Sequence, residues 1–179
     1  MSASPAWRPD DPWSMFSLRE LAGGGVDAYL QKVAEAAAAE FDAAGASIFI
    51  SDGDDGMYRV RARAGRHSTV PDKALIIRGQ GVAGRVVSRG VPRILGDIST
   101  DPDLIDIAPI DRSAVSSSMV VPLEDSGGKT VGVLNLSRQS GHRAFHYNDL
   151  DRVRALAAMI SLAVANAHLV EKLQREVHE

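Results

Sequence analysis

Apolar residues recur at helical spacing in two segments, one near each end of the chain. From Val26 to Phe41 they return every three or four residues, which predicts an amphipathic helix that Gly45 ends. Two such seams run along the C-terminal segment and predict a long helix from about Asn148 to the end of the chain. A helix with two apolar seams is buried on two sides, so we expect it to contact both a sheet and another helix.

The segments between these helices predict an antiparallel sheet. Strand-like segments occupy residues 46–51, 58–64, 91–95, 118–123 and 130–137. The first is apolar on both faces, as in a central strand, and the second alternates so that Tyr58, Val60, Ala62 and Ala64 are expected to face inward. A hairpin turn joins the last two strands, and residues 97–113 predict a loop with a short helix. The order of these elements predicts an α+β fold.

The second seam of the C-terminal helix predicts a dimer. It comprises Leu156, Met159, Ala163, Asn166, Val170, Leu173 and Val177, whereas the first seam becomes polar at Glu171. We therefore expect the helix to leave the domain and pair with a second copy as a coiled coil, in which Asn166 sets the register. In the alternative, the helix packs only within its own domain and frays after His168. The chain then divides into an irregular arm (1–25), a domain (26–169) and the start of a C-terminal helix (170–179).

Composition narrows the class of protein. The 179 residues fit one domain, and 20 Lys and Arg against 23 Asp and Glu give a net charge of −3, which does not favour nucleic-acid binding. No residue is Cys, so disulfides, thiolate-bound metals, Cys nucleophiles and thioether-linked chromophores are excluded. Residues 157–167 form the longest apolar stretch, about half a membrane span, and no signal peptide is recognisable. We expect a cytoplasmic protein that does not enter a membrane.

Candidate chemistry is sparse. Gly79, Gly81 and Gly84 match the spacing of a dinucleotide-binding turn, but the short helix after them and the hairpin-joined strands favour a turn in which the backbone makes a close approach. His142 and His146 lie four residues apart, yet they straddle an expected helix start, so no metal site is predicted. A haem held by one axial His remains an alternative. With no nucleophile elbow and no carboxylate pair beside a base, we expect no catalytic residues and no enzyme.

Five segments, in order, resemble those of a GAF domain. They are Gly79-Gln-Gly-Val-Ala-Gly-Arg-Val, Asp97-x-x-x-Asp101-Pro102, Ser118-Met-Val-Val-Pro-Leu, Val131-Gly-Val-Leu-Asn-Leu and Phe145-x-x-x-Asp149 with the helix that follows it. The resemblance covers residues 26–169. It implies a central antiparallel sheet with the first and last helices packed on one face, and a small-molecule pocket, covered by loops and a helix, on the other.

The resemblance also implies which residues line the pocket. They are Phe49, Val82, Ala83, Asp97, Ile98, Ser118, Val120 and Asn135. Asn135 is polar among apolar neighbours on its strand, so once buried it needs a hydrogen-bond partner. A ligand, a water molecule or a loop backbone would supply one.

The same resemblance limits the ligand. Members that bind cyclic nucleotides carry an Asn-Lys…Phe-x-x-x-Asp-Glu signature; Phe145 and Asp149 match it, whereas Arg138, Gln139 and Leu150 do not. Together with the acidic loop over the pocket, this departure argues against a cyclic nucleotide. The branches that bind bilins covalently or reduce free methionine sulfoxide need the Cys that this chain lacks.

We therefore expect a non-catalytic sensory and dimerisation module of a bacterial signal-transduction protein, such as a histidine kinase, cyclase or transcriptional regulator. Its ligand is an unidentified small molecule, and an output domain or partner signalling protein receives the signal. In the alternative, the chain is a ligand-free dimerisation scaffold whose own side chains fill the pocket, among them Ile105, Ile107 and Ile110.

Overall fold

The computed structural model describes residues 18–178, apart from residues 52, 54, 67–69 and 99–115. Its helices are α1 (Leu18–Glu40), α2 (Gly81–Arg89) and α3 (Tyr147–His178). Its strands are β1 (Gly45–Ser51), β2 (Met57–Ala64), β3 (Leu75–Ile77), β4 (Arg93–Leu95), β5 (Ser117–Glu124) and β6 (Thr130–Arg138). The strands form one antiparallel sheet in the order β3-β2-β1-β6-β5-β4, so the predicted central strand is central.

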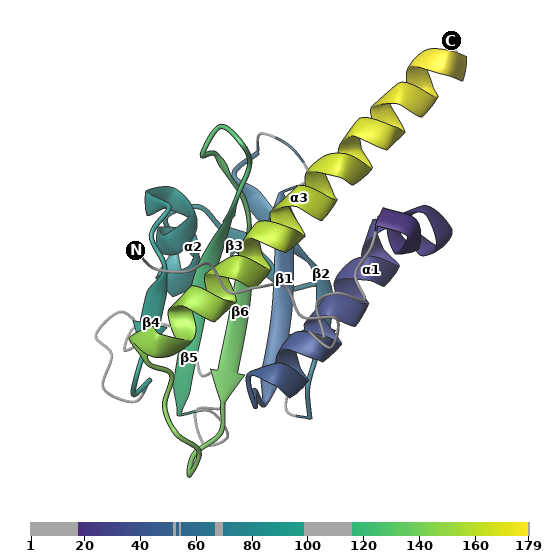
Figure 1. Ribbon diagram of the computed structural model, residues 1–179. Coiled ribbons are helices and arrows are strands. Elements are labelled where there is room, and N and C mark those ends of the chain that lie inside the picture. The colour runs from purple at the N-terminus through teal and green to yellow at the C-terminus, as the bar shows by residue number, and fades with distance from the viewer. Residues whose placement is uncertain (1–17, 52, 54, 67–69, 99–115, 179) are drawn as a thin grey trace, which may run out of the picture.

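Helices α1 and α3 lie side by side on one face of this sheet (Figure 1). The core between them and the sheet contains Leu30, Val33 and Phe41 of the first helical segment, Ile48, Ile50, Met119, Leu134 and Leu136 of the sheet, and Val153, Leu156, Ile160 and Val164 of α3. Residues of both α3 seams are thus buried, because the helix contacts the sheet on one side and α1 on the other. The predicted α+β fold is confirmed.

Helix α2 covers the opposite face of the sheet, which we call the α2 face. Phe49, Val120 and Val133 from three strands pack there with Val82 and Val86 of the helix. This packing depends on a close approach at Gly84, where a Cβ atom would lie 2.2 Å from the carbonyl oxygen of Ile77. The glycine spacing that resembles a dinucleotide-binding turn is therefore explained by contact between α2 and the sheet.

The predicted alternation of the second strand is wrong in its C-terminal half. Tyr58 and Val60 pack on the α2 face, whereas Ala62 and Ala64 pack on the face that carries α1 and α3. The pairing with β1 skips one residue, Arg61, so the strand changes the face to which its side chains point. Nothing in the alternation of the sequence distinguishes this bulge from a regular strand.

A buried arginine joins the two helices to the end of β6. Arg138 is 6% exposed, and its Nε and Nη2 atoms donate to the carbonyl oxygen of Phe41, just after α1, at 3.1 and 2.6 Å. Its Nη1 atom donates to the carbonyl oxygen of Arg143 at 3.1 Å and lies 3.8 Å from Asp149 of α3. The guanidinium carbon also lies 4.0 Å from the centre of the Phe145 ring. Burial lowers the pKa of Arg138, and the charge of Asp149 opposes that shift.

Asp149 receives hydrogen bonds at the start of α3. The backbone N–H of His146 donates to its Oδ2 atom at 2.9 Å, as in a capping box, and the Arg143 guanidinium donates to Oδ1 at 2.8 Å. Burial by itself would raise the pKa of Asp149, but these hydrogen bonds and the charges of Arg143 and Arg138 lower it below the ordinary value. The folded state therefore favours the ionised carboxylate.

Replacing Arg138 with Met should lower the free energy of unfolding by roughly 2–4 kcal/mol. The change leaves the carbonyl oxygen of Phe41 without its donor and removes one of the positive charges beside Asp149. Arg143→Gln is the matched control. Its side chain pairs with the same carboxylate but is 65% exposed, so we expect a loss below about 1 kcal/mol. Urea denaturation of both variants makes the measurement, and equal losses would contradict a special role for the buried guanidinium.

Acid should destabilise the protein partly through Asp149. Because the folded state lowers its pKa, the carboxylate contributes stability that is present above the pKa of the unfolded chain, about 4, and lost as the pH falls through the lower folded value. Asp149→Asn should flatten the fall in stability over that acidic range, whereas Asp151→Asn, at an exposed position on the same turn, should leave the fall as steep as in the parent. Thermal unfolding measured from pH 6 downward would show the difference, and parallel curves would contradict this account.

Candidate functional site

The structure brings most of the expected pocket residues together on the α2 face. Phe49, Val82, Ile98 and Val120 are buried there in one apolar cluster, against which Ala83 packs. Ser118 is buried, Asn135 is half-buried and Asp97 is exposed after β4. The segment expected to cover this face, including Ile105, Ile107 and Ile110, lies outside the described residues.

Three polar side chains form a row beside this apolar cluster. Ser47 of β1 pairs in register with Asn135 of β6, and Asn135 pairs with Val120 of β5, two residues from Ser118. All three point to the α2 face, because the residues flanking each of them point to the α1 and α3 face. We call Ser47, Asn135 and Ser118 the polar row. Ser47 was not predicted from the sequence, although it stands two residues before Phe49 and therefore on the same face.

The polar row has more hydrogen-bonding groups than partners. The Ser118 hydroxyl lies 2.9 Å from Oδ1 of Asn135 and 3.0 Å from the carbonyl oxygen of Leu136, yet it has a single proton to donate. Whichever way the Asn135 amide is oriented, its other end has no partner among the described residues. Ser47 is 2% exposed, and its hydroxyl also lacks a hydrogen bond within the described part of the chain. Buried polar groups of this kind are usually hydrogen-bonded.

A positive charge next to the row, that of Arg63, is already compensated. Arg63 pairs in register with Ser47 across β1 and β2. Its Nη1 atom donates to the carbonyl oxygen of Val70 at 2.6 Å, and its Nη2 atom forms an ion pair with Asp72. The polar row therefore offers neutral hydroxyl and amide groups rather than a free charge.

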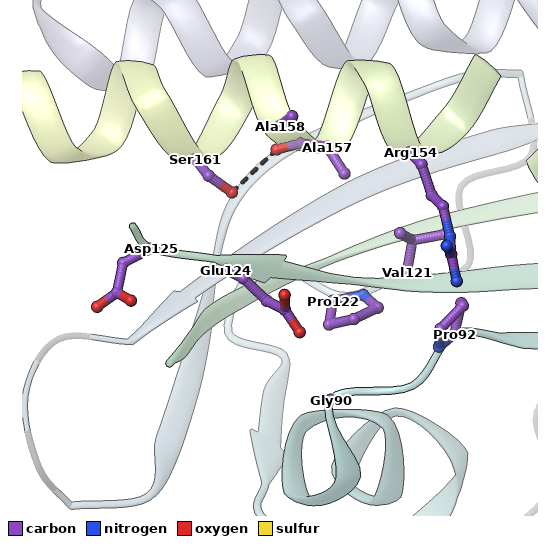
Figure 2. Close-up of a pocket in the computed structure, with 10 residues that line it drawn as sticks. All are labelled: Gly90, Pro92, Val121, Pro122, Glu124, Asp125, Arg154, Ala157, Ala158 and Ser161. Carbon is purple, nitrogen blue, oxygen red and sulfur yellow. Dashed lines mark hydrogen bonds between the residues drawn. The ribbon is translucent and has the colours of Figure 1, made fainter. Parts of the chain in front are cut away.

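One cavity lined by described residues lies elsewhere, between α3 and the outer edge of β5. It has a volume of about 480 Å³ and is lined from three sides by Gly90, Pro92, Val121, Pro122, Glu124, Asp125, Arg154, Ala157, Ala158 and Ser161 (Figure 2). None of the residues expected to line a pocket belongs to it. A smaller cavity, of about 70 Å³, adjoins His142 and Asp42, whose Nδ1 and Oδ2 atoms lie 3.2 Å apart.

The residues of the expected dimer seam divide into two groups. Leu156 and Ala163 are buried in the core of their own chain, and Met159 and Asn166 are half-buried. Val170, Leu173 and Val177 are exposed, as are the neighbouring Leu162 and Leu169. Only the part of the seam beyond the sheet is therefore open to a partner.

Helix α3 is also long and apolar enough to cross a membrane, judged by length and composition alone. Its first half packs into the core against the sheet and α1, as Val153 and Ile160 show. A core helix passes the same test, so this finding is weak support for a membrane span.

Metal-binding groups do not converge in the described part of the structure. No three His, Asp or Glu side chains gather there in a way that could hold a metal ion. The whole sequence contains no Cys, so this chain supplies no thiol for redox or nucleophilic chemistry.

Residues 25–165 match the family model of the GAF domain. The match covers most of the chain, so the chain belongs to the GAF family. GAF domains are commonly sensory or regulatory modules of signalling proteins. No protein of curated function matches the chain in sequence.

Solved structures share the fold at low sequence identity. The GAF domain of a phosphoenolpyruvate-protein phosphotransferase from Coxiella burnetii aligns with a TM-score of 0.72 at 21% identity, over 86% of this chain and 91% of that one. Residues 122 to 287 of a methyl-accepting chemotaxis protein align with a TM-score of 0.69 at 21% identity, over 81% and 92%. A free methionine-R-sulfoxide reductase from Neisseria meningitidis, solved with its substrate, gives 0.67 at 23% identity, over 81% of each chain. The fold thus occurs both in signalling proteins and in an enzyme.

The hydrogen-bond count of the polar row predicts opposite effects for its two serines. Ser47→Ala removes a buried hydroxyl that has no partner, so the free energy of unfolding should stay unchanged or rise by up to about 1 kcal/mol. Ser118→Ala removes the partner of Asn135 and should lower it by about 1–2 kcal/mol. Urea denaturation of the two variants tests this, and a greater loss for Ser47→Ala would show that its hydroxyl is satisfied.

Proposed function

We propose that this chain is a non-catalytic, cytoplasmic sensory module of a bacterial signalling protein, that it binds a small molecule on the α2 face, and that it dimerises through α3. The observation that carries the proposal is the polar row, which places unsatisfied hydroxyl and amide groups beside an apolar cluster. Small-molecule sites commonly combine an apolar wall with a few polar groups that orient the ligand.

The chemistry of the row favours a neutral ligand with hydrogen-bond acceptors. Asn135 and Ser47 can donate to a carbonyl oxygen or a ring nitrogen, while Phe49 and Val120 would contact an apolar body. A charged ligand would lose its hydration without gaining a free opposite charge, because Arg63 is already paired.

Strand β6 supports a route from this site to α3. Asn135 lies on the α2 face, and three residues later Arg138 binds the end of α1 and the start of α3 from the other side of the sheet. A ligand that shifts β6 would therefore move the groups that hold α3. The similarity to a chemotaxis protein domain is consistent with such a role in signalling.

The exposed residues of α3 support a dimer. Val170, Leu173 and Val177 follow one another at spacings of three and four, which places them on one side of the helix. Val177 is 81% exposed, and the packing of the described residues leaves this stripe uncovered. Pairing with a second copy would bury it.

One observation favours a second candidate, a ligand-free dimerisation scaffold. The apolar cluster on the α2 face is already closely packed, with Val133 fully buried and Phe49, Val87 and Val120 nearly so. If the chain's own side chains fill the α2 face in this way, no ligand binds there and the function that remains is dimerisation.

Native mass spectrometry of the purified chain at tens of micromolar, compared with the denatured protein, tests both ligand binding and dimerisation. We expect a dimer that carries an additional non-covalent mass. Asn135→Leu should lose that mass and keep the dimer, because it removes the amide of the polar row. A triple change of Val170, Leu173 and Val177 to Gln should give a monomer, whereas Lys172→Gln, at an exposed position between them, should not.

The other outcomes separate the candidates. A dimer without additional mass, in which Asn135→Leu changes nothing, supports the scaffold. A monomer of the unchanged chain contradicts dimerisation through α3. An additional mass that survives Asn135→Leu places the ligand somewhere other than the polar row.

A further inference from the structure

The cavity beside α3 lies where the sheet loses a strand. β4 pairs with Ser118, Met119 and Val120 only, so the outer edge of β5 from Val121 onward has no neighbouring strand in the described structure. Helix α3 passes over this edge, and the turn after α2 closes the space from below in Figure 2. Its volume of about 480 Å³ is within the range of about 300–1,000 Å³ that is typical of small-molecule sites.

One end of the cavity is electronegative. The carboxylate of Glu124 lies against Gly90, at which an added Cβ atom would be 3.2 Å from Oε1. Gly90 caps the C-terminus of α2, where the helix dipole contributes partial negative charge. Asp125 also lines this end, but its Oδ1 atom already accepts the N–H groups of Gly127 and Lys129 in the hairpin turn. Glu124 has no such partner among the described residues, so we assign it as the acceptor for a ligand.

The other end is positive. Arg154 projects from α3 into the cavity, and Pro122 lies between it and Glu124 (Figure 2). Neither charged side chain forms a hydrogen bond or ion pair with another residue in the part of the chain that the structure describes. The space between them is walled by buried apolar groups of Val121, Pro122 and Ala157.

We propose that this cavity is a second ligand site and that it binds a small zwitterion, with an amine at Glu124, a carboxylate at Arg154 and a short apolar spacer over Pro122. The opposite charges on the two sides of an apolar wall match such a molecule at both ends. One exposed ion pair contributes little, but two pairs made by one ligand contribute together. The bound molecule would connect β5 to α3, the helix that extends beyond the domain.

A peptide strand fits this edge less well. Pro122 has no backbone N–H, and a proline on a strand edge removes one of the ladder hydrogen bonds on which an added strand depends. The charged side chains are therefore the recognition groups that remain.

Three probes of equal chain length test the proposal: 5-aminopentanoate, pentanoate and pentylamine. Each is titrated into the ¹⁵N-labelled full chain while the backbone amide signals are followed. We expect saturable shifts around residues 121–125 and 154–161 with 5-aminopentanoate, and at least tenfold weaker binding of the two probes that carry a single charge. Arg154→Gln should remove the preference over pentylamine, and Glu124→Gln the preference over pentanoate.

Two control variants keep the result specific. Arg175→Gln removes an arginine from the exposed end of α3 and should leave all three affinities unchanged. Asn135→Leu alters the polar row and should also leave them unchanged, so this site and the proposed sensory site can fail independently. Equal affinities for the three probes, shifts that do not saturate, or an unchanged preference in Arg154→Gln and Glu124→Gln would each overturn the proposal. The amide spectrum of each variant shows that it is folded.

Discussion

The position of α3 depends on a buried guanidinium. A charge removed from water costs several kcal/mol unless its donors are matched, so Arg138 is tolerated only where the end of α1, the loop before α3 and the start of α3 all present acceptors. The helices supply the acceptors that Arg138 needs, and Arg138 in turn restricts where the helices can lie. Any shift of α1 or α3 relative to β6 would leave that charge poorly paired, which gives the packing of the two helices a defined geometry that apolar contacts alone would not specify.

The two faces of β6 separate the polar row from the packing of the helices. Asn135 belongs to the α2 face, while Leu134, Leu136 and Arg138 belong to the face that carries the helices. β6 is paired on both sides over most of its length, by β1 and β5, so it moves with its neighbours rather than alone. A perturbation on the α2 face would therefore reach α3 through the sheet.

The fold was largely predictable from the sequence because its signals are local. Helical seams, alternating strands and a hairpin turn each lie within one short segment. The features that were missed depend on distant partners instead: the bulge at Arg61 exists only in the pairing of β1 with β2, and the burial of Arg138 depends on the Phe41 carbonyl, 97 residues away. Ser47 was missed for the same reason. Its role depends on its pairing with Asn135 on another strand and on the lack of a hydrogen-bond partner for its hydroxyl among the described residues. The expected pocket wall came from a family resemblance. A resemblance of this kind predicts which apolar positions lie together, but it does not predict which polar groups are hydrogen-bonded.

Length explains why the second seam of α3 has two environments. The helix has 32 residues, about 48 Å at 1.5 Å per residue, whereas β6 has nine residues, about 30 Å. The sheet can therefore cover only the first part of the helix, and periodicity cannot reveal where that cover ends. The C-terminal end of α3 extends past the sheet (Figure 1). Leu156 and Ala163, early in the seam, are buried, while Leu173 and Val177, late in the same seam, are exposed. The described residues of this chain leave those side chains uncovered while α3 stays a straight helix, and pairing with a second copy of α3 would bury them.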